Sequence, residues 1–202
     1  ICAKQNNSIA QFILGKIYYD GEFVQKDINK AIDYFTLSSE LNNHEAQFML
    51  GQIYFFDENK KDIQKSIYYF TLSANQNNPM SQFVLSQIYY DGKYVKKDIN
   101  KSIYYLTLSS EQNYSDAQYF LGLIFYDGIY VQRNIKKSIH YLTLSSNQNN
   151  SNAQFFLGKL YYFGTYIAQD IDTSIHYLTL SSNLNHSDAQ FLLGTLFYEK
   201  RY

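Results

Sequence analysis

The chain has 202 residues and a formal net charge of −1, with 17 basic and 18 acidic side chains. This near balance gives no basic surface of the kind that binds nucleic acid, so we expect no nucleic-acid partner. Charged residues make up only 17% of the chain, and Asn, Gln, Ser and 22 Tyr supply much of its polar surface. Because Tyr is enriched in interfaces, this composition is compatible with a protein-binding surface.

Cys2 is the only cysteine, so the chain cannot form an intrachain disulfide. This cysteine usage is typical of a reducing compartment and favours an intracellular, cytoplasmic location. The sequence contains no stretch of about 20 apolar residues, so we also expect no membrane span.

A short motif recurs along the chain, first as Ala10-Gln11-Phe12-Ile13-Leu14-Gly15. The motif returns about every 36 residues, and a fixed period of this length indicates a solenoid, in which each repeat packs on its neighbours. We expect one array over 1–202, and because both ends fall inside a repeat we expect it to be a fragment of a longer protein. The glutamines of successive motifs, 35 or 36 residues apart, are Gln11, Gln47, Gln82, Gln118, Gln154 and Gln190. The units lie near 8–43, 44–78, 79–114, 115–150 and 151–186, with a partial unit at 187–202.

Each repeat predicts two helices, of which the first covers segments such as 8–19, 115–126 and 151–162. Ser8 and Gln11 fit a capping box, in which the Ser oxygen accepts a backbone N–H and the Gln reaches back to the cap. The same pair recurs at Ser115 and Gln118, Ser151 and Gln154, and Ser187 and Gln190. His44 and Pro79 take the Ser position in two repeats, so those caps must differ.

A glycine follows the first helix in four repeats, where we expect the left-handed backbone conformation that often ends a helix. These glycines are Gly21, Gly92, Gly128 and Gly164. Short polar residues that favour N-caps start the second helix, at Asp27, Asp62, Asp98, Asn134 and Asp170. The second helices are expected at 28–41, 63–76, 99–112, 135–148 and 171–184. Asparagines end them, and we expect positive φ at Asn42, Asn113, Asn149 and Asn185. The second repeat lacks one loop residue and its glycine, where Phe56-Asp57-Glu58-Asn59 stands.

These residues resemble the Sel1-like repeat, a relative of the tetratricopeptide repeat. The chain departs from that pattern by a Ser-Ser pair in place of Ala-Ala and by Asn in place of the following Gly. The resemblance implies an all-α, right-handed α-solenoid of helix–turn–helix repeats that serves as an adaptor or scaffold. The residues that carry it in the first repeat are Ala10, Phe12, Leu14, Gly15, Tyr18, Gly21, Val24, Asp27, Lys30, Ala31, Tyr34, Ser38, Ser39 and Asn42.

The sequence shows no catalytic constellation, and we expect no enzyme activity, no cofactor and no metal site. His140 and His176 occupy equivalent positions in the second helices of two repeats. Neighbouring helices would hold them about 8–10 Å apart, which is too far for one metal ion with bonds of about 2.1 Å. We expect His44 and His186 to lie in turns between repeats, and the sequence near Cys2 offers no residue that would make it a catalytic nucleophile.

A partner-binding groove is predicted from the positions at which the internal repeats differ. Residues 13, 16 and 20 lie on one face of the first helix, and Glu45 and Met80 stand at a variable position at the start of that face. By resemblance to tetratricopeptide arrays, the first helices line the concave surface. Solvent exposure alone is the alternative explanation of this variability. The candidate groove residues are Ile13, Lys16, Asp20, Met49, Gln52, Val84, Gln87, Asp91, Phe120, Leu123, Asp127, Phe156 and Lys159.

The leading hypothesis is therefore a non-enzymatic protein–protein interaction scaffold or adaptor. Its partner would be a protein, held as an extended or helical peptide segment in the groove or as a neighbour in a larger assembly. The alternative is a docking or regulatory repeat region of a larger signalling protein, for example one that carries a protein kinase domain outside this segment.

Overall fold

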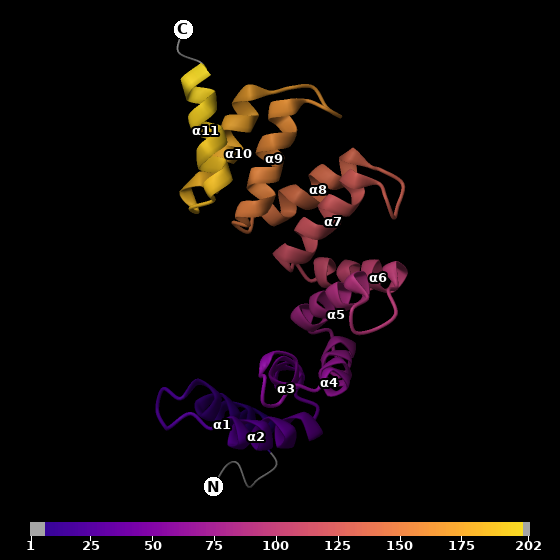
Figure 1. Ribbon diagram of the computed structural model, residues 1–202, viewed down its shortest axis with the longest axis vertical. Coiled ribbons are helices and arrows are strands. Elements are labelled where there is room, and N and C mark those ends of the chain that lie inside the picture. The colour runs from indigo at the N-terminus through magenta and orange to yellow at the C-terminus, as the bar shows by residue number, and fades with distance from the viewer. Residues whose placement is uncertain (1–6, 200–202) are drawn as a thin grey trace. The chain divides into compact units, whose positions relative to one another are not determined.

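The computed structural model describes residues 7–199, with side chains as far as Tyr198. Cys2 and the repeat end expected near it lie outside the described residues. Between residues 7 and 199 the chain forms eleven α-helices and no β-strand (Figure 1). The helices are α1 (Ser8–Asp20), α2 (Ile28–Glu40), α3 (His44–Phe56), α4 (Ile63–Asn75), α5 (Pro79–Asp91), α6 (Ile99–Glu111), α7 (Ser115–Asp127), α8 (Ile135–Ser146), α9 (Ser151–Phe163), α10 (Ile171–Asn183) and α11 (Ser187–Glu199).

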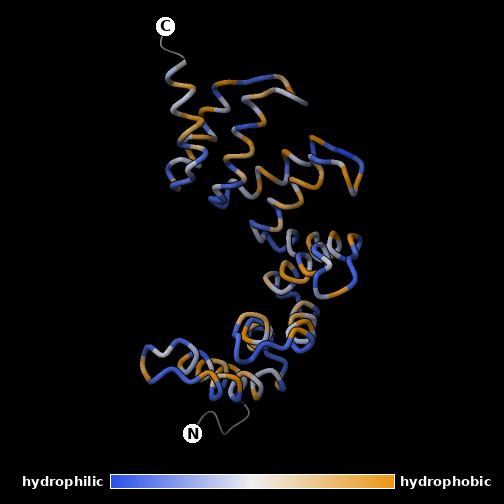
Figure 2. Tube along the Cα trace, in the orientation of Figure 1, coloured by the Kyte–Doolittle hydropathy of each residue, from blue (hydrophilic) through white to orange (hydrophobic). Residues whose placement is uncertain are grey.

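Odd-numbered helices are the first helices of the repeats and are called helices A; even-numbered helices are called helices B. The chain divides into two compact units, Ile1–Leu108 and Ser109–Tyr202. In the first unit α1 packs on α2, α2 on α3, α3 on α4 and α4 on α5; in the second, α7 to α11 pack consecutively in the same way. Apolar residues recur along every helix, whereas the turns from a helix B to the next helix A are hydrophilic (Figure 2). The predicted all-α arrangement of helix–turn–helix repeats is confirmed.

The N-caps of helices A differ from the prediction. Asn7 caps α1, because its Oδ1 accepts the backbone N–H of Ala10 at 3.0 Å. Ser8 is the first helical residue, one position later than a capping box requires. The capping-box prediction is wrong, because the residue before the serine takes the cap position: Asn7 precedes Ser8 and Asn150 precedes Ser151, whereas Tyr114, before Ser115, forms no side-chain cap bond. Equivalent side-chain caps are Asn43, Asn78 and Asn150.

The recurring glutamine of helix A has a different partner from the one predicted. Gln82 Nε2 donates to the carbonyl oxygen of Ala74 at 3.1 Å, and the Gln82 side chain is fully buried. The glutamine thus adds a second hydrogen bond to a carbonyl at the end of the preceding helix B, which also accepts the backbone N–H of Asn77 in the turn at 3.0 Å. This bond fixes the turn between consecutive repeats. The same bond joins Gln47 to Ser39, Gln118 to Ser110, Gln154 to Ser146 and Gln190 to Ser182.

Helices B start as predicted and end one or two residues earlier than predicted. Asp27 Oδ1 accepts the N–H of Lys30 at 3.0 Å and so caps α2. At the other end Asn42 has φ of 60°, and the N–H of Asn43 donates to the Ser38 carbonyl at 3.2 Å. The predicted positive φ is confirmed at all four asparagines, with values of 59° to 61°, and also occurs at Asn77.

The first serine of the pair that replaces the family's Ala-Ala links the two helices of one repeat; the pair is Ser73-Ala74 in the second repeat and Ser-Ser in the other full repeats. Ser73 is fully buried in α4, and its Oγ donates to the backbone carbonyl of His44 at 2.7 Å. That carbonyl belongs to the first residue of α3, so the bond sets where the end of helix B meets the start of helix A. Equivalent bonds run from Ser38 to Ser8, Ser145 to Ser115 and Ser181 to Ser151.

Candidate partner-binding surface

The predicted groove positions are all accessible in the structure. Five of the thirteen side chains are exposed, namely Ile13, Lys16, Asp20, Asp91 and Asp127. The other eight are half-buried, and none is buried. The constant positions of the same helices behave differently: Gln47 and Leu50 in α3, for example, are buried. The variable positions therefore form an accessible face of the helices A, beside a constant face that packs in the core.

In the first unit this face contains a hollow of about 280 Å³ between α1, α3 and α5. Two predicted groove residues, Lys16 and Met49, meet there, together with Glu45 and Met80 from the variable start of the face. Comparison of the repeats did not single out Phe12, Phe48 or Asn78, which complete the lining. The lining residues are Phe12, Lys16, Glu45, Phe48, Met49, Asn78 and Met80.

The two phenylalanines of this hollow also pack in the core of their repeats. The Phe12 ring lies 5.8 Å from the Phe35 ring, and the Phe48 ring lies 5.8 Å from the Phe70 ring, both measured between ring centres. Since Phe35 and Phe70 are fully buried, these contacts hold the floor of the hollow in place. The hollow is therefore a feature of the packed array and not of a mobile loop.

The second unit has a smaller hollow of about 140 Å³ between α7 and α9. It contains two predicted groove residues, Phe156 and Lys159. Tyr126 meets Phe156 edge to face at a ring distance of 5.0 Å, and burial raises the pKa of the Tyr126 hydroxyl above its ordinary value. Tyr126 thus stays protonated at neutral pH and can donate a hydrogen bond. The lining residues are Tyr126, Phe156, Lys159, Leu160, Phe163 and Thr165.

The remaining predicted groove residues line neither hollow. Some of them pack on the core, as Val84 does beside the buried Phe70 and Leu85. The structure therefore brings the predicted residues together in two places and spreads the others along the helices. These other residues are Ile13, Asp20, Gln52, Val84, Gln87, Asp91, Phe120, Leu123 and Asp127.

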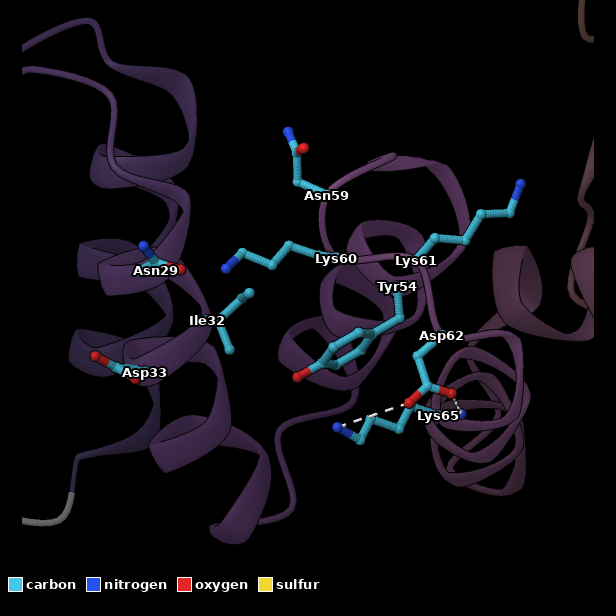
Figure 3. A pocket seen from close by; sticks show the side chains of 9 residues that line it. All are labelled: Asn29, Ile32, Asp33, Tyr54, Asn59, Lys60, Lys61, Asp62 and Lys65. Carbon is cyan, nitrogen blue, oxygen red and sulfur yellow. Dashed lines mark hydrogen bonds and ion pairs between the residues drawn. The ribbon is translucent and has the colours of Figure 1, made fainter.

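A third hollow, of about 430 Å³, lies in the first unit at the shortened connection of the second repeat. Figure 3 shows Lys60 extending toward α2, Lys61 pointing away, and Lys65 beside Asp62, where Nζ and Oδ2 are 3.7 Å apart. The sequence did not predict this hollow. Its lining is mostly charged or amide side chains, in contrast to small-molecule sites, which are mainly apolar. The full lining is Asn29, Ile32, Asp33, Tyr54, Asn59, Lys60, Lys61, Asp62 and Lys65.

The described side chains contain no group of three or more His, Cys, Asp or Glu that could hold a metal ion. His140 and His176 are exposed, and each meets the next tyrosine edge to face, at ring distances of 5.4 Å from Tyr141 and 5.3 Å from Tyr177. Across the part of the chain that the structure describes, no helix is both long and apolar enough to span a membrane.

The Sel1 repeat matches residues 8–43, 44–78, 79–114, 115–150, 151–186 and 187–201 of this chain. The chain belongs to the Sel1 repeat family. Repeats of this family generally form non-catalytic scaffolds that mediate protein–protein interactions. No curated protein matches the sequence.

Solved structures agree with this assignment. A Sel1 repeat protein from Oxalobacter formigenes is 27% identical, with a TM-score of 0.89 over 97% of this chain and 80% of its own. A protective antigen of uropathogenic Escherichia coli is 28% identical, with a TM-score of 0.89 over 96% of this chain, but this chain spans only 42% of that antigen. Cysteine-rich protein B of Helicobacter pylori is 27% identical over 66% of this chain and 96% of its own, with a TM-score of 0.51. The solenoid fold that the resemblance implied is therefore confirmed.

Proposed function

We propose that the protein is a non-enzymatic scaffold that binds a peptide segment of a partner protein along the accessible face of its helices A. The observation that carries this proposal is the pair of hollows at repeat positions that vary between copies. At the constant positions of the same helices, the side chains pack in the core, as Leu85 does, or form hydrogen bonds to another helix, as Gln82 does. The variable, accessible side chains around each hollow are not required for this packing, so they can differ between repeats and can contact a partner.

The size of the two hollows supports a peptide rather than a small molecule. At about 280 Å³ and 140 Å³ both lie below the range of roughly 300–1,000 Å³ typical of small-molecule sites. Each suits one apolar side chain of an extended or helical segment. The first hollow has two methionines in its lining, Met49 and Met80, whose flexible side chains adapt to different occupants.

The alternative, a docking or regulatory region of a larger signalling protein, would use the same groove in a longer polypeptide. A test of the groove therefore applies to both. In the test, the partner is captured from native extract by the chain and by a variant with Lys16, Gln52, Gln87, Leu123 and Lys159 all changed to Ala. A control variant carries Ala at Tyr104, Lys136 and His176, which are exposed residues of helices B.

We expect the groove variant to lose capture and the control variant to retain it. Melting curves of all three proteins should nearly coincide, because accessible substitutions usually change stability by less than about 0.5 kcal/mol each. Unchanged capture by the groove variant would contradict the proposal and direct attention to the helices B. A collapsed melting temperature would show that these side chains belong to the core.

A further inference from the structure

The hollows on the helices A of the two units combine the same kinds of side chain. In the first unit, two phenylalanines and two methionines line the hollow together with Lys16. In the second unit, three of the six lining residues are aromatic, and Lys159 lies among them. Lys16 and Lys159 occupy the same position of their repeats. Each hollow therefore places aromatic rings beside one lysine. The aromatic residues are Phe12 and Phe48 in the first hollow and Tyr126, Phe156 and Phe163 in the second.

The two phenylalanines of the first hollow already belong to one aromatic pair each. The ring planes of Phe12 and Phe35 are inclined by 44°, and those of Phe48 and Phe70 by 50°. Phe12 and Phe48 are only half-buried, so each ring keeps atoms that face the hollow. Because aromatic rings favour tilted or edge-to-face neighbours, a further ring in the hollow would extend both pairs.

The methionines of the first hollow give a second reason to expect an aromatic occupant. Met49 packs against the core of its repeat, whereas Met80 is 40% exposed. A thioether sulfur makes favourable contacts with aromatic rings, often at the ring edge. An aliphatic occupant would gain burial beside the same side chains but no contact of this kind.

The lysine of this repeat position is able to reach an aromatic ring. Lys159 Nζ lies 5.3 Å from the centre of the Phe155 ring, within the distance of roughly 6 Å at which cation–π attraction acts. The two ion pairs of the described residues lie at the starts of α2 and α4 and do not include the exposed Lys16. The Lys16 ammonium group is therefore available to a ring in the first hollow. Glu45 lines the same hollow, so the lining has no net formal charge and selects no charged partner.

We infer that the partner segment places an aromatic side chain, in preference to an aliphatic one, in the hollow between α1, α3 and α5. This inference rests on the proposed function and names the anchor residue that the groove takes. The ring packs against Phe12 and Phe48 and contacts the sulfur of Met80. One face of the ring meets the Lys16 ammonium group. An aliphatic side chain of the same size is buried equally well but makes none of the aromatic, sulfur or cation contacts.

The test uses the chain labelled with carbon-13 at its methionine methyl groups. The chain has only two methionines, and both line this hollow, so both NMR signals report on it. The Met80→Leu variant assigns the two signals. The probes are acetylated and amidated peptides of the form Gly-Ser-X-Ser-Gly, in which X is Phe, cyclohexylalanine or Ser. Cyclohexylalanine has the carbon skeleton of Phe without its π-electrons, so burial of apolar surface alone would favour it at least as much.

We expect the Phe peptide to bind about threefold to tenfold more tightly than the cyclohexylalanine peptide, because contacts of a ring with other rings and with sulfur add an advantage of this order. Titration of the methyl signals measures both affinities. The ring current of the bound Phe should also move the methyl proton signals further at saturation than cyclohexylalanine does. The Ser peptide should move neither signal.

Variants of the chain then locate the contacts. Met80→Leu keeps an apolar side chain of similar size and removes the sulfur, and Lys16→Gln removes the cation. Each should weaken the Phe peptide more than the cyclohexylalanine peptide, with the Met49 signal as the readout in Met80→Leu. The matched control is Lys61→Gln, because Lys61 is exposed and points away from the neighbouring helices (Figure 3). This control should keep the full preference for Phe, and melting curves show that each variant is folded.

The outcomes separate this inference from the proposed function. If the cyclohexylalanine peptide binds as tightly as the Phe peptide or more tightly, the hollow accepts any apolar side chain, and the aromatic inference is overturned while the groove stands. A preference for Phe that remains unchanged in both Met80→Leu and Lys16→Gln would overturn it as well, because the ring would then lie elsewhere. Methyl signals that no peptide moves would exclude the hollow as an anchor site and contradict the proposed function in the first unit.

Discussion

Gly51 lies so close to the ring of Phe70 that a Cβ atom on Gly51 would be 2.6 Å from Phe70 Cδ1. This approach lets α3 pack directly against α4 and explains why the repeat motif ends in glycine. The same relationship joins Gly15 to Phe35 in the first unit. Leucine replaces phenylalanine in the second unit, where the pairs are Gly122 with Leu142 and Gly158 with Leu178.

Gly51→Ala should lower the melting temperature of the array. Phe70 is fully buried, and a methyl group forced into a packed core costs about 1–3 kcal/mol. The control is Gly194→Ala, because nothing lies within 4 Å of a Cβ at Gly194. Alanine is favoured over glycine inside a helix by about 1 kcal/mol, so that variant should be neutral or stabilised. Circular dichroism melts measure both, and equal shifts would contradict the packing argument.

The repeat pattern predicted the helices and most of their ends because the residues responsible are local. Asp27 and Asn42 act within a few residues of their own position, so composition and spacing suffice to place them. The capping box failed for a related reason: Asn7 and Ser8 are both good N-caps, and spacing alone does not choose between neighbours. The partner of Gln82 was missed because the Ala74 carbonyl belongs to another helix, and a local pattern does not show such a bond.

The candidate surface was predicted less completely than the fold. Variation between repeats identified Lys16 and Met49, but Phe12 also lines the hollow although its position is aromatic in every repeat. One side of such a ring packs in the core and the other side reaches the surface. The same residue therefore contributes to the core and to the hollow, and the repeat pattern shows only its place in the core. The polar hollow near Lys60 depends on a missing loop residue, whose effect on packing requires the three-dimensional structure.

Ser66→Ala should destabilise the array more than Ser138→Ala, although the two serines occupy equivalent positions. Ser66 Oγ donates to the Gly51 carbonyl at 2.9 Å, and a hydrogen bond of this kind contributes about 0.5–1.5 kcal/mol. Ser138 Oγ is buried and has no hydrogen-bond partner among the described residues. Removing it should be neutral or stabilising, as Ala31 at the same position of the first repeat suggests. Chemical denaturation of both variants tests this, and equal losses would contradict it.

Asn149→Gly should be neutral or slightly stabilising, whereas Asn149→Val should lower stability by about 1–2 kcal/mol. Asn149 has φ of 61°, a conformation that glycine adopts freely and a β-branched residue adopts with strain. The exposed Asn152, in the first turn of α9, provides a comparison site at which φ is helical. If valine costs the same at residues 149 and 152, the left-handed conformation is not what selects asparagine.

Leu184→Gln should stabilise the fifth repeat. In the second and fourth repeats a glutamine at this position donates to the buried glutamine of helix A, with Gln148 Nε2 2.7 Å from Gln118 Oε1. Leu184 cannot donate, and Gln154 Oε1 is buried without a hydrogen-bond partner in the described part of the chain. A new bond to it should add about 1 kcal/mol. The reciprocal variant, Gln148→Leu, should lose a similar amount, and stability that does not change in either direction would refute the pairing.

Asp170→Asn should reduce the loss of stability in acid. The backbone N–H of Thr173 donates to the Asp170 carboxylate at 3.0 Å, and the Thr173 hydroxyl donates to it at 2.7 Å. These two bonds, the backbone bond first, hold the pKa of Asp170 below its ordinary value. A lowered folded-state pKa means that the ionised carboxylate stabilises the fold above the unfolded pKa of about 3.9. That contribution is lost as the pH falls through the folded pKa.

Asparagine keeps the cap without a titrating group, as Asn134 does at the equivalent position, where its Oδ1 accepts the Lys137 N–H at 3.0 Å. Melting temperatures of the parent and the variant should therefore differ most near neutral pH and converge as the pH falls below the lowered pKa of folded Asp170. The other carboxylates titrate equally in both proteins, so the difference between the two curves isolates Asp170. A constant difference across this pH range would show that ionisation of Asp170 does not contribute to the cap.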